Sequence, residues 1–283
     1  MKLKINSRTE FNTNKPPLII SEISGNHCGS KKKFLDLIRI ASDKGADLVK
    51  IQTYEPVDIT IKSKIPALTI KGGLWKNKTY WDLYKKACTP FSWHDSAFNL
   101  ASKKRITLFS TPFSIRAVKL LKNFNVPLFK IASLEITDLR LVKYIASLNK
   151  PIIISTGAST IFEVKKAVNV IRKYHNKIII LHCVSEYPTP LNDANLSRIT
   201  KLKKNFKKNL IGLSDHTRTI DTSLASIPLG VVAIEKHFKD SLKNKSLDAE
   251  FSITPKELKE LKLKSLIYFN ATKMNNFETN QVD

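Results

Sequence analysis

Two lysines and two histidines stand at the ends of short apolar segments, and their types define the chemistry that this sequence could support. Lys50 and Lys130 offer ammonium groups, which bind phosphate and carboxylate groups. His216 and His237 offer imidazoles, which can hold a divalent cation and leave positions open for water and a substrate carbonyl. The sequence therefore predicts an anion site beside a catalytic metal.

Hydroxyl and carboxylate side chains end neighbouring segments and extend this set. The hydroxyls that could add hydrogen bonds to an anion are those of Thr111, Ser133, Ser155 and Ser214. The carboxylates that could transfer protons or orient other side chains are those of Glu22, Glu135 and Glu235. No Walker-type glycine loop is present, so a nucleotide phosphate site is not predicted.

Other reactive residues have simpler structural interpretations. His182 follows an apolar run and suits the core as well as a site, and His94 stands where a helix begins. His175, at a predicted helix end, is interpreted as a capping or surface residue. Cys183 is expected to pack as a small apolar group. A Schiff base at Lys130 or Lys50 stays open as an alternative chemistry.

Eight β-branched runs alternate with amphipathic stretches and must position these residues. The predicted strands are 18–22, 47–52, 106–110, 128–131, 151–155, 177–182, 210–214 and 231–236. The predicted helices are 31–44, 114–123, 137–148, 160–174, 193–208, 219–228 and 255–270. Regular alternation favours parallel strands, and eight units predict a single-domain α/β protein, a (β/α)8 TIM barrel.

Helix signals support this division. Phe34, Leu37, Ile38 and Ala41 fall on one stripe of the stretch 31–44. Thr160 with Glu163, and Thr254 with Pro255, are typical of helix starts.

Catalytic groups of such barrels lie at the carboxyl ends of the strands, so the polar residues at all eight ends are expected to share one opening. This ring includes Asn26 and His27 after the first strand, Asp215 directly after the seventh and Lys236 at the end of the eighth. Lys50 and Gln52 have the same parity, so both should point into the barrel.

The barrel is assigned to residues 16–270, with residues 1–15 as an extension that caps its bottom. A connection of about forty residues, 53–93, contains all three tryptophans and is interpreted as an ordered rim. The polar tail 271–283 is expected to fray.

Composition sets further limits on function. The chain has 48 Lys and Arg against 24 Asp and Glu, a net charge of +24 spread along its length, which favours a solvated surface over nucleic-acid binding. Such a field would also attract a phosphorylated substrate. Three separated cysteines fit a reducing cytoplasm. No apolar window suits a signal peptide or membrane span, so no membrane partner is expected.

Several segments resemble the sialic acid synthase family. They run in family order and are 20–27 (ISEISGNH), 45–53 (GADLVKIQT), 110–113 (STPF), 130–135 (KIASLE), 150–157 (KPIIISTG), 187–190 (YPTP), 212–217 (GLSDHT) and 234–238 (IEKHF). Two regions are more similar to the pseudaminic acid branch: 24–27 (SGNH), and 70–75 (IKGGLW) with 82–84 (DLY) and 89–94 (TPFSWH).

The resemblance implies an enzyme that condenses phosphoenolpyruvate with the aldehyde of an N-acetylated amino sugar. It implies that phosphoenolpyruvate is held by Lys50, Thr111, Lys130, Ser133, Ser155 and Ser214. It also implies a divalent metal, Mn²⁺ or Mg²⁺, on His216 and His237, and proton transfer by Glu22. The residues expected to contact the sugar are Gln52, Tyr187 and Asp248, and Glu135 is expected to bind substrate as well. A homodimer is implied as well.

Some features depart from the family pattern. The chain ends before the C-terminal antifreeze-like domain of full-length relatives, which reaches across the dimer. Thr219 replaces a glycine, Lys239 replaces a threonine, and the residues before Asp248 differ. These changes lie on the sugar side, so N-acetylneuraminate or legionaminate synthesis stays open as an alternative. Less favoured alternatives are a Schiff-base aldolase, an inactive relative and a basic binding protein.

Overall fold

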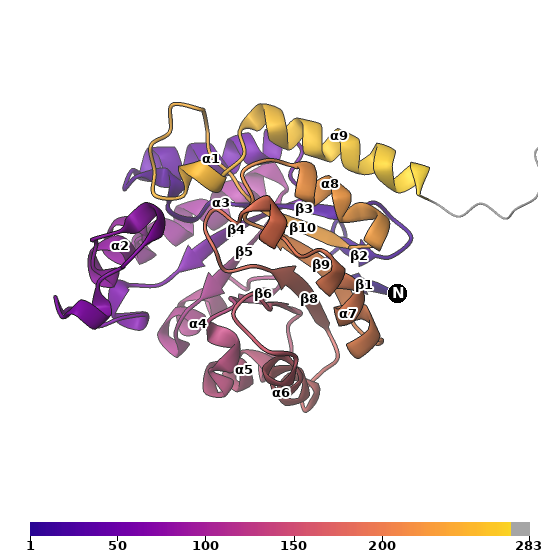
Figure 1. Cartoon of the computed structure of the whole chain (residues 1–283), viewed down its shortest axis with the longest axis horizontal. Coiled ribbons are helices and arrows are strands. Elements are labelled where there is room, and N and C mark those ends of the chain that lie inside the picture. Colours follow the sequence, from indigo (N-terminus) through magenta and orange to yellow (C-terminus); the bar gives the residue numbers. More distant parts are fainter. Residues whose placement is uncertain (273–283) are drawn as a thin grey trace, which may run out of the picture.

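Eight parallel strands close into a barrel, as the sequence predicts. The structure is a computed structural model and describes residues 1–272 (Figure 1). The strands follow one another around the barrel in the order β10-β3-β4-β5-β6-β7-β8-β9. Their bounds are β3 (Leu18–Glu22), β4 (Leu48–Thr53), β5 (Thr107–Pro112), β6 (Phe129–Ile131), β7 (Ile152–Ser155), β8 (Ile178–Cys183), β9 (Leu210–Asp215) and β10 (Ala233–His237).

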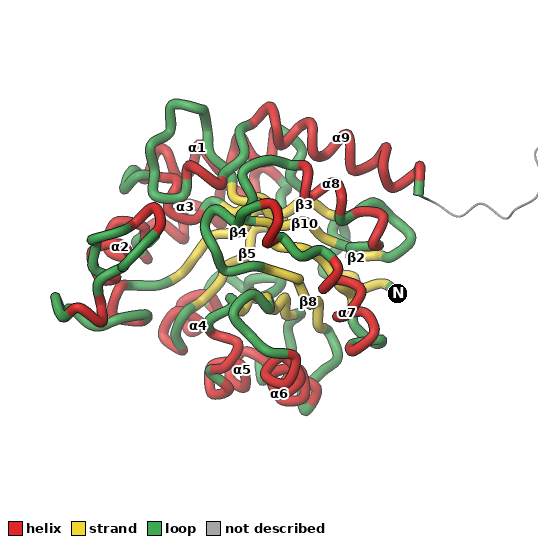
Figure 2. Tube along the Cα trace, in the orientation of Figure 1, coloured by secondary structure: helices red, strands yellow, loops and turns green. Residues whose placement is uncertain are grey.

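Helices surround the barrel, as Figure 2 shows in red around the yellow strands. Their bounds are α1 (Lys31–Asp43), α3 (His94–Lys104), α4 (Ile115–Lys122), α5 (Leu139–Ala146), α6 (Ile161–Arg172), α7 (Ser197–Asn205), α8 (Asp221–Ala225) and α9 (Pro255–Ala271). The predicted apolar stripe of α1 is buried in the layer between helices and strands. Both predicted helix starts are confirmed, because Thr160 and Thr254 each form a complete capping box.

Two predicted helices are too long. The prediction 193–208 begins at the last residue of a separate 3-10 turn, Leu191–Asp193, whereas α7 runs only from Ser197 to Asn205. The prediction 219–228 includes Pro228, which lies in the 3-10 turn Ile227–Leu229 after α8 has ended. Proline lacks the amide hydrogen that a continuing helix needs.

The connection after β4 is ordered and contains the helix α2 (Tyr80–Ala87), which the sequence did not reveal. Thr79 caps this helix by accepting a hydrogen bond from the Asp82 amide at 3.0 Å. Figure 1 shows α2 to the left of the barrel, and its residues Tyr80, Leu83, Tyr84 and Ala87 line the cavity described below. The rest of the connection consists of loops and the 3-10 turns Pro56–Asp58, Pro66–Leu68, Gly73–Trp75 and Phe91–Trp93.

An antiparallel hairpin of β1 (Lys2–Lys4) and β2 (Glu10–Asn12) covers the amino-terminal end of the barrel. Phe11 is fully buried and packs in one cluster with residues inside the barrel, including Ile20 and Phe109. Thr9 joins the hairpin to Thr107, the first residue of β5, by a hydroxyl contact of 2.7 Å. The site must therefore open at the opposite end.

The described chain stops two residues into the predicted tail, so residues 273–283 of that prediction lie outside the described residues. No helix within residues 1–272 is both long and apolar enough to cross a membrane.

Candidate active site

A cavity of about 470 Å³ opens at the carboxyl ends of the strands. Every predicted site residue except Glu22 lines this cavity: Lys50, Gln52, Thr111, Lys130, Ser133, Glu135, Ser155, Tyr187, Ser214, His216, His237 and Asp248. Glu22 lies beside the cavity, fully buried against Lys50. The strand-end positions thus come together as predicted, including the shared direction of Lys50 and Gln52.

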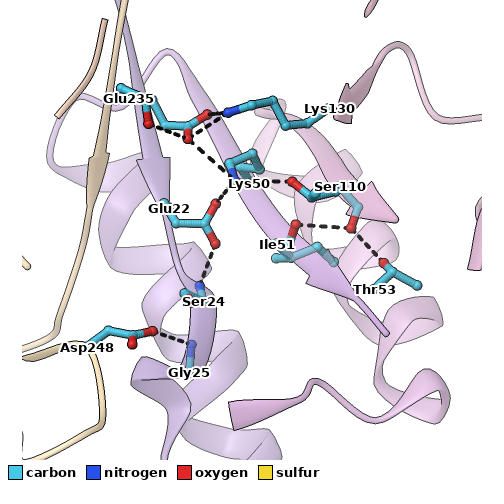
Figure 3. Close-up of polar contacts among 12 residues, drawn as sticks. Glu22, Ser24, Gly25, Lys50, Ile51, Thr53, Ser110, Lys130, Glu235 and Asp248 are labelled. Carbon is cyan, nitrogen blue, oxygen red and sulfur yellow. Dashed lines mark hydrogen bonds and ion pairs between the residues drawn. The ribbon is translucent and has the colours of Figure 1, made fainter. Parts of the chain in front are cut away.

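Two lysines and two carboxylates form a continuous buried network of ion pairs (Figure 3). The Lys130 ammonium donates to both oxygens of Glu235, at 2.8 and 2.7 Å. The Lys50 ammonium lies 3.5 Å from Glu235 Oε1 and forms a close ion pair with Glu22. Lys50 also donates to Thr111 Oγ1 at 3.2 Å, and the Ser214 hydroxyl donates to Glu235 at 3.1 Å. Each of the four charged side chains in this network is therefore held by a neighbour.

These contacts separate the pKa values of the two carboxylates. Burial acts to raise the pKa of Glu235, but Lys130 and Lys50 outweigh it and hold the pKa at about 2. Burial raises the pKa of Glu22, and Lys50 only partly offsets this effect. Burial also lowers the pKa of Lys130, against the pull of Glu235. Glu235 is consequently the stable anion, and Glu22 is the carboxyl that more readily takes a proton.

The two predicted metal ligands face each other across the same cavity. The rings of His216 and His237 have centroids 5.4 Å apart. His216 Nδ1 lies 2.7 Å from the Val184 carbonyl, to which it donates, so Nε2 is left to face a ligand. His237 Nδ1 is buried and has no hydrogen-bond partner. Burial lowers the pKa of His237 well below its ordinary value, which keeps this imidazole neutral.

These imidazoles fit a divalent cation. A metal binds to an unprotonated ring nitrogen, and His237 Nδ1 is buried without a hydrogen-bond partner. Burial acts to lower the pKa of His216, while Cys183 and the Val184 carbonyl leave it raised, so a cation would have to displace a proton there. Within residues 1–272 no three or more His, Cys, Asp or Glu residues gather as a metal site. Water and substrate would complete the coordination.

Further predicted substrate-binding residues line the same cavity. Asp248 is buried and accepts a hydrogen bond from the Gly25 amide at 3.0 Å, which ties its loop to the end of β3 (Figure 3). The Tyr187 ring packs on His216 with centroids 4.2 Å apart. Burial raises the pKa of Glu135 to about 7, and its Oε2 has no partner. The Ser155 hydroxyl is also buried without a partner.

Trp75 is a cavity residue that the sequence did not single out. Its indole donates to the Leu247 carbonyl at 3.1 Å, so the connection after β4 meets the loop after β10. The Trp75 ring lies 6.0 Å from Tyr187 and 6.3 Å from Phe251, centroid to centroid. The clustering of all three tryptophans in this connection was the available signal.

Asn26, His27, Asp215 and Lys236, which were expected at the shared opening, do not line the cavity. Asn26 donates to the Phe238 carbonyl at 2.8 Å, and His27 packs edge-on against Trp93 at 5.3 Å. Both follow β3 within a turn that directs Asn26 towards the segment after β10 and His27 towards Phe34 and Trp93. Asp215 and Lys236 lie on the outer face of the barrel, because side chains alternate along a strand and their neighbours point inward.

The remaining reactive residues have these positions. His182 is a core residue, with Nε2 2.8 Å from the Ala194 carbonyl, and His94 starts α3 as predicted. The surface interpretation of His175 is wrong: the residue is buried, and its Nδ1 accepts from the Lys177 amide at 3.2 Å. Cys183 is buried as expected, but it also lines the cavity, 3.8 Å from His216 Nδ1.

The fold and the cavity are those of a (β/α)8 barrel enzyme whose site lies at the carboxyl ends of its strands. The model of the NeuB family matches residues 37–274. The chain therefore belongs to the NeuB family.

Named relatives agree with this assignment. A pseudaminic acid synthase of Campylobacter jejuni is 40% identical over 252 residues, covering 89% of this chain and 73% of the relative. A pseudaminic acid synthase of Helicobacter pylori is 41% identical over 242 residues, covering 84% and 70%. The crystal structure of an N-acetylneuraminic acid synthetase from Leptospira borgpetersenii, in complex with citrate, superposes with a TM-score of 0.89 at 29% identity, covering 99% of this chain and 93% of that one.

Proposed function

We propose that this chain condenses phosphoenolpyruvate with the open-chain aldehyde of an N-acetylated amino sugar and forms a nonulosonic acid of the pseudaminic type. The observation that carries this proposal is the single cavity shared by Lys50, Lys130, His216 and His237. Its two lysines suit an anion that carries both a phosphate and a carboxylate. The two relatives named pseudaminic acid synthase support the pseudaminic type.

In this proposal the buried amines receive the anion. Lys50 and Lys130 bind the phosphate and carboxylate, assisted by the hydroxyls of Thr111, Ser133, Ser155 and Ser214. The unpartnered Ser155 hydroxyl is ready to donate a hydrogen bond. Glu235 holds the Lys130 and Lys50 amines in place before the substrate arrives.

The reaction forms one carbon–carbon bond and breaks one carbon–oxygen bond. C3 of phosphoenolpyruvate attacks the aldehyde carbon, water adds at C2, and inorganic phosphate leaves with the oxygen that joined it to C2. Glu22 transfers the proton beside the reacting carbon, since burial raises the pKa of its carboxyl. Water is consumed once for each phosphate released.

The sugar and the metal occupy the other walls. Gln52, Glu135, Tyr187 and Asp248 contact the sugar. His216 and His237 would hold Mn²⁺ or Mg²⁺, which when bound supplies positive charge at the aldehyde oxygen. Further parts of the proposal are a cytoplasmic location, with which the three free cysteines agree, and a homodimer.

Phosphate release tests the proposal. The purified full chain would be incubated with Mn²⁺, phosphoenolpyruvate and a panel of N-acetylated aldoses that differ in the number of acetamido groups and in the hydroxyl at C6. We expect release that needs both an aldose and the metal and that stops with a chelator, and the aldose that supports the fastest release identifies the sugar.

Other results identify the alternatives. Faster turnover with a polyhydroxylated monoacetamido sugar indicates N-acetylneuraminate synthesis. Trapping of a lysine by borohydride, with no effect of the chelator, indicates a Schiff-base aldolase. Salt-sensitive binding of DNA or RNA without release of phosphate contradicts the enzyme proposal.

A further inference from the structure

A buried ion pair lies on the outside of the barrel, behind the two cavity histidines. The Lys236 ammonium is 3.1 Å from Asp215 Oδ2, and the two side chains are 0% and 1% exposed. Lys236 of β10 stands beside Asp215 of β9 in the parallel register. Each of these residues immediately precedes one of the histidines, so the pair joins the two strand ends that carry the imidazoles.

Additional hydrogen bonds extend the pair to the other side of His216. Lys236 donates to the Thr217 carbonyl at 2.5 Å, and Asp215 Oδ1 accepts from the Thr217 amide and hydroxyl, both at 2.8 Å. Ser223 of α8 donates to Asp215 Oδ2 at 2.5 Å. Lys236 therefore holds the residue before His216 and the residue after it, from the position next to His237.

Stability alone does not explain an ion pair at this place. The layer between barrel and helices is mainly an apolar core, to which Ile220, Ile234 and Leu258 belong. Moving two charges into such a layer costs several kcal/mol for each ion, and well-packed apolar replacements of buried pairs are often at least as stable. Unlike an apolar contact, the ion pair is directional, because its hydrogen bonds fix the angle between the two strand ends.

We propose that Lys236 and Asp215 are positioning residues that set the distance and orientation of the His216 and His237 imidazoles. Neither lines the main cavity, so they act on a ligand only through the histidines. One consequence, tighter binding of a divalent cation, rests on the proposed function. The other consequence, a fixed arrangement of the two imidazoles, does not depend on that function.

Mn²⁺ binding without any substrate tests the first of these consequences. Free Mn²⁺ would be measured by electron paramagnetic resonance with the full chain, the Lys236→Met variant, and a His216→Ala variant that removes one imidazole. We expect Lys236→Met to weaken binding by about 10- to 100-fold, the range found when partners of metal ligands are removed. Lys262→Met is the matched control: it breaks the Lys262–Asp47 pair, 2.7 Å long, away from the cavity, and should leave binding unchanged.

Imidazole NMR gives a readout that needs no metal. The His216 Nδ1 proton, held by the Val184 carbonyl, should shift or broaden in Lys236→Met and not in Lys262→Met. If the unsubstituted chain binds no Mn²⁺ but this signal still moves, the proposed metal role fails and the positioning role stands. Unchanged Mn²⁺ affinity together with an unchanged imidazole spectrum overturns the positioning role and leaves the proposed function intact.

A second variant keeps the proposal testable if Lys236→Met fails to fold. Lys236→Met leaves Asp215 as a buried unpaired charge, which can itself unfold the chain. Lys236→Met/Asp215→Asn removes that charge while keeping similar volume, and the same two measurements apply to it. A folded double variant with normal Mn²⁺ affinity and a normal His216 signal contradicts the proposal.

Discussion

Glu135 should make the folded chain less stable as the pH rises, because it is partly buried at the cavity wall and its Oε2 is shielded from solvent. Burial raises its pKa from 4.5 to about 7, and Oε2 has no hydrogen-bond partner. The folded state then holds a proton that the unfolded chain has already lost, so the free energy of unfolding falls between about pH 4.5 and pH 7. At about 1.36 kcal/mol per pKa unit, the full effect is at most roughly 3 kcal/mol.

Glu135→Gln replaces the carboxyl with an amide that does not titrate. Urea unfolding of both proteins at pH 5 and pH 8 should show that the variant gains roughly 2 kcal/mol relative to the unsubstituted chain between these two pH values. Comparing one variant at two pH values cancels the fixed cost of burying the amide. The protein must be free of substrate, since a ligand would change the carboxyl's surroundings.

Glu163→Gln serves as the control for this measurement. Glu163 is partly exposed, and hydrogen bonds from Thr160 lower its pKa, so its stabilising effect is lost only below about pH 4.5 and should not change between pH 5 and pH 8. An equal stability difference at both pH values for Glu135→Gln would refute the reasoning, because it would mean that Glu135 titrates as an ordinary exposed carboxyl.

Two further substitutions separate binding from folding. Lys130→Met removes both hydrogen bonds to Glu235 and one of the two amines offered to the anion, and calorimetry should show at least about 100-fold weaker binding of phosphoenolpyruvate. Binding within a few-fold of normal would exclude Lys130 from the anion site. Phe11→Ala removes a fully buried ring at the opposite end of the barrel and should lower the free energy of unfolding by about 3–5 kcal/mol without changing KM. A change in KM would show that the hairpin is coupled to the cavity.

The barrel and most of its cavity were predictable because two simple rules act together. Parallel strands buried on both faces read as apolar runs, and runs such as Ile178–Cys183 are easy to recognise. The end of each run then places a polar residue at the shared opening, whatever the intervening helix contains. Lys50 and Lys130 could be assigned to one site for this reason, although 80 residues separate them.

Whether a side chain at a strand end points into the barrel or out of it was harder to predict. Asp215, His216, Lys236 and His237 are adjacent polar residues, and the sequence does not state which of them turn inward after a strand ends. The loop after β3 likewise directs His27 into a contact with Trp93. Pairing across the register, not residue type, decides these cases.

Segments held by long-range contacts were missed for a different reason. The helix α2 has only eight residues, and most of them are polar or aromatic, so its periodicity is weak. Trp75 acquires its place from Leu247, which is 172 positions away. No local pattern reports such a contact.

The charges of the cavity are balanced without substrate, and this balance constrains how an anion can enter. Two buried amines, Lys50 and Lys130, would each be costly if unpaired, and the carboxylates of Glu22 and Glu235 compensate them. An anion that binds both amines must therefore take over hydrogen bonds that Glu235 now accepts. The excess negative charge is then most easily relieved at Glu22, whose pKa is raised, because Glu235 has its pKa held at about 2. Anion entry should accordingly be coupled to uptake of a proton by Glu22, which places that proton beside the reacting carbon.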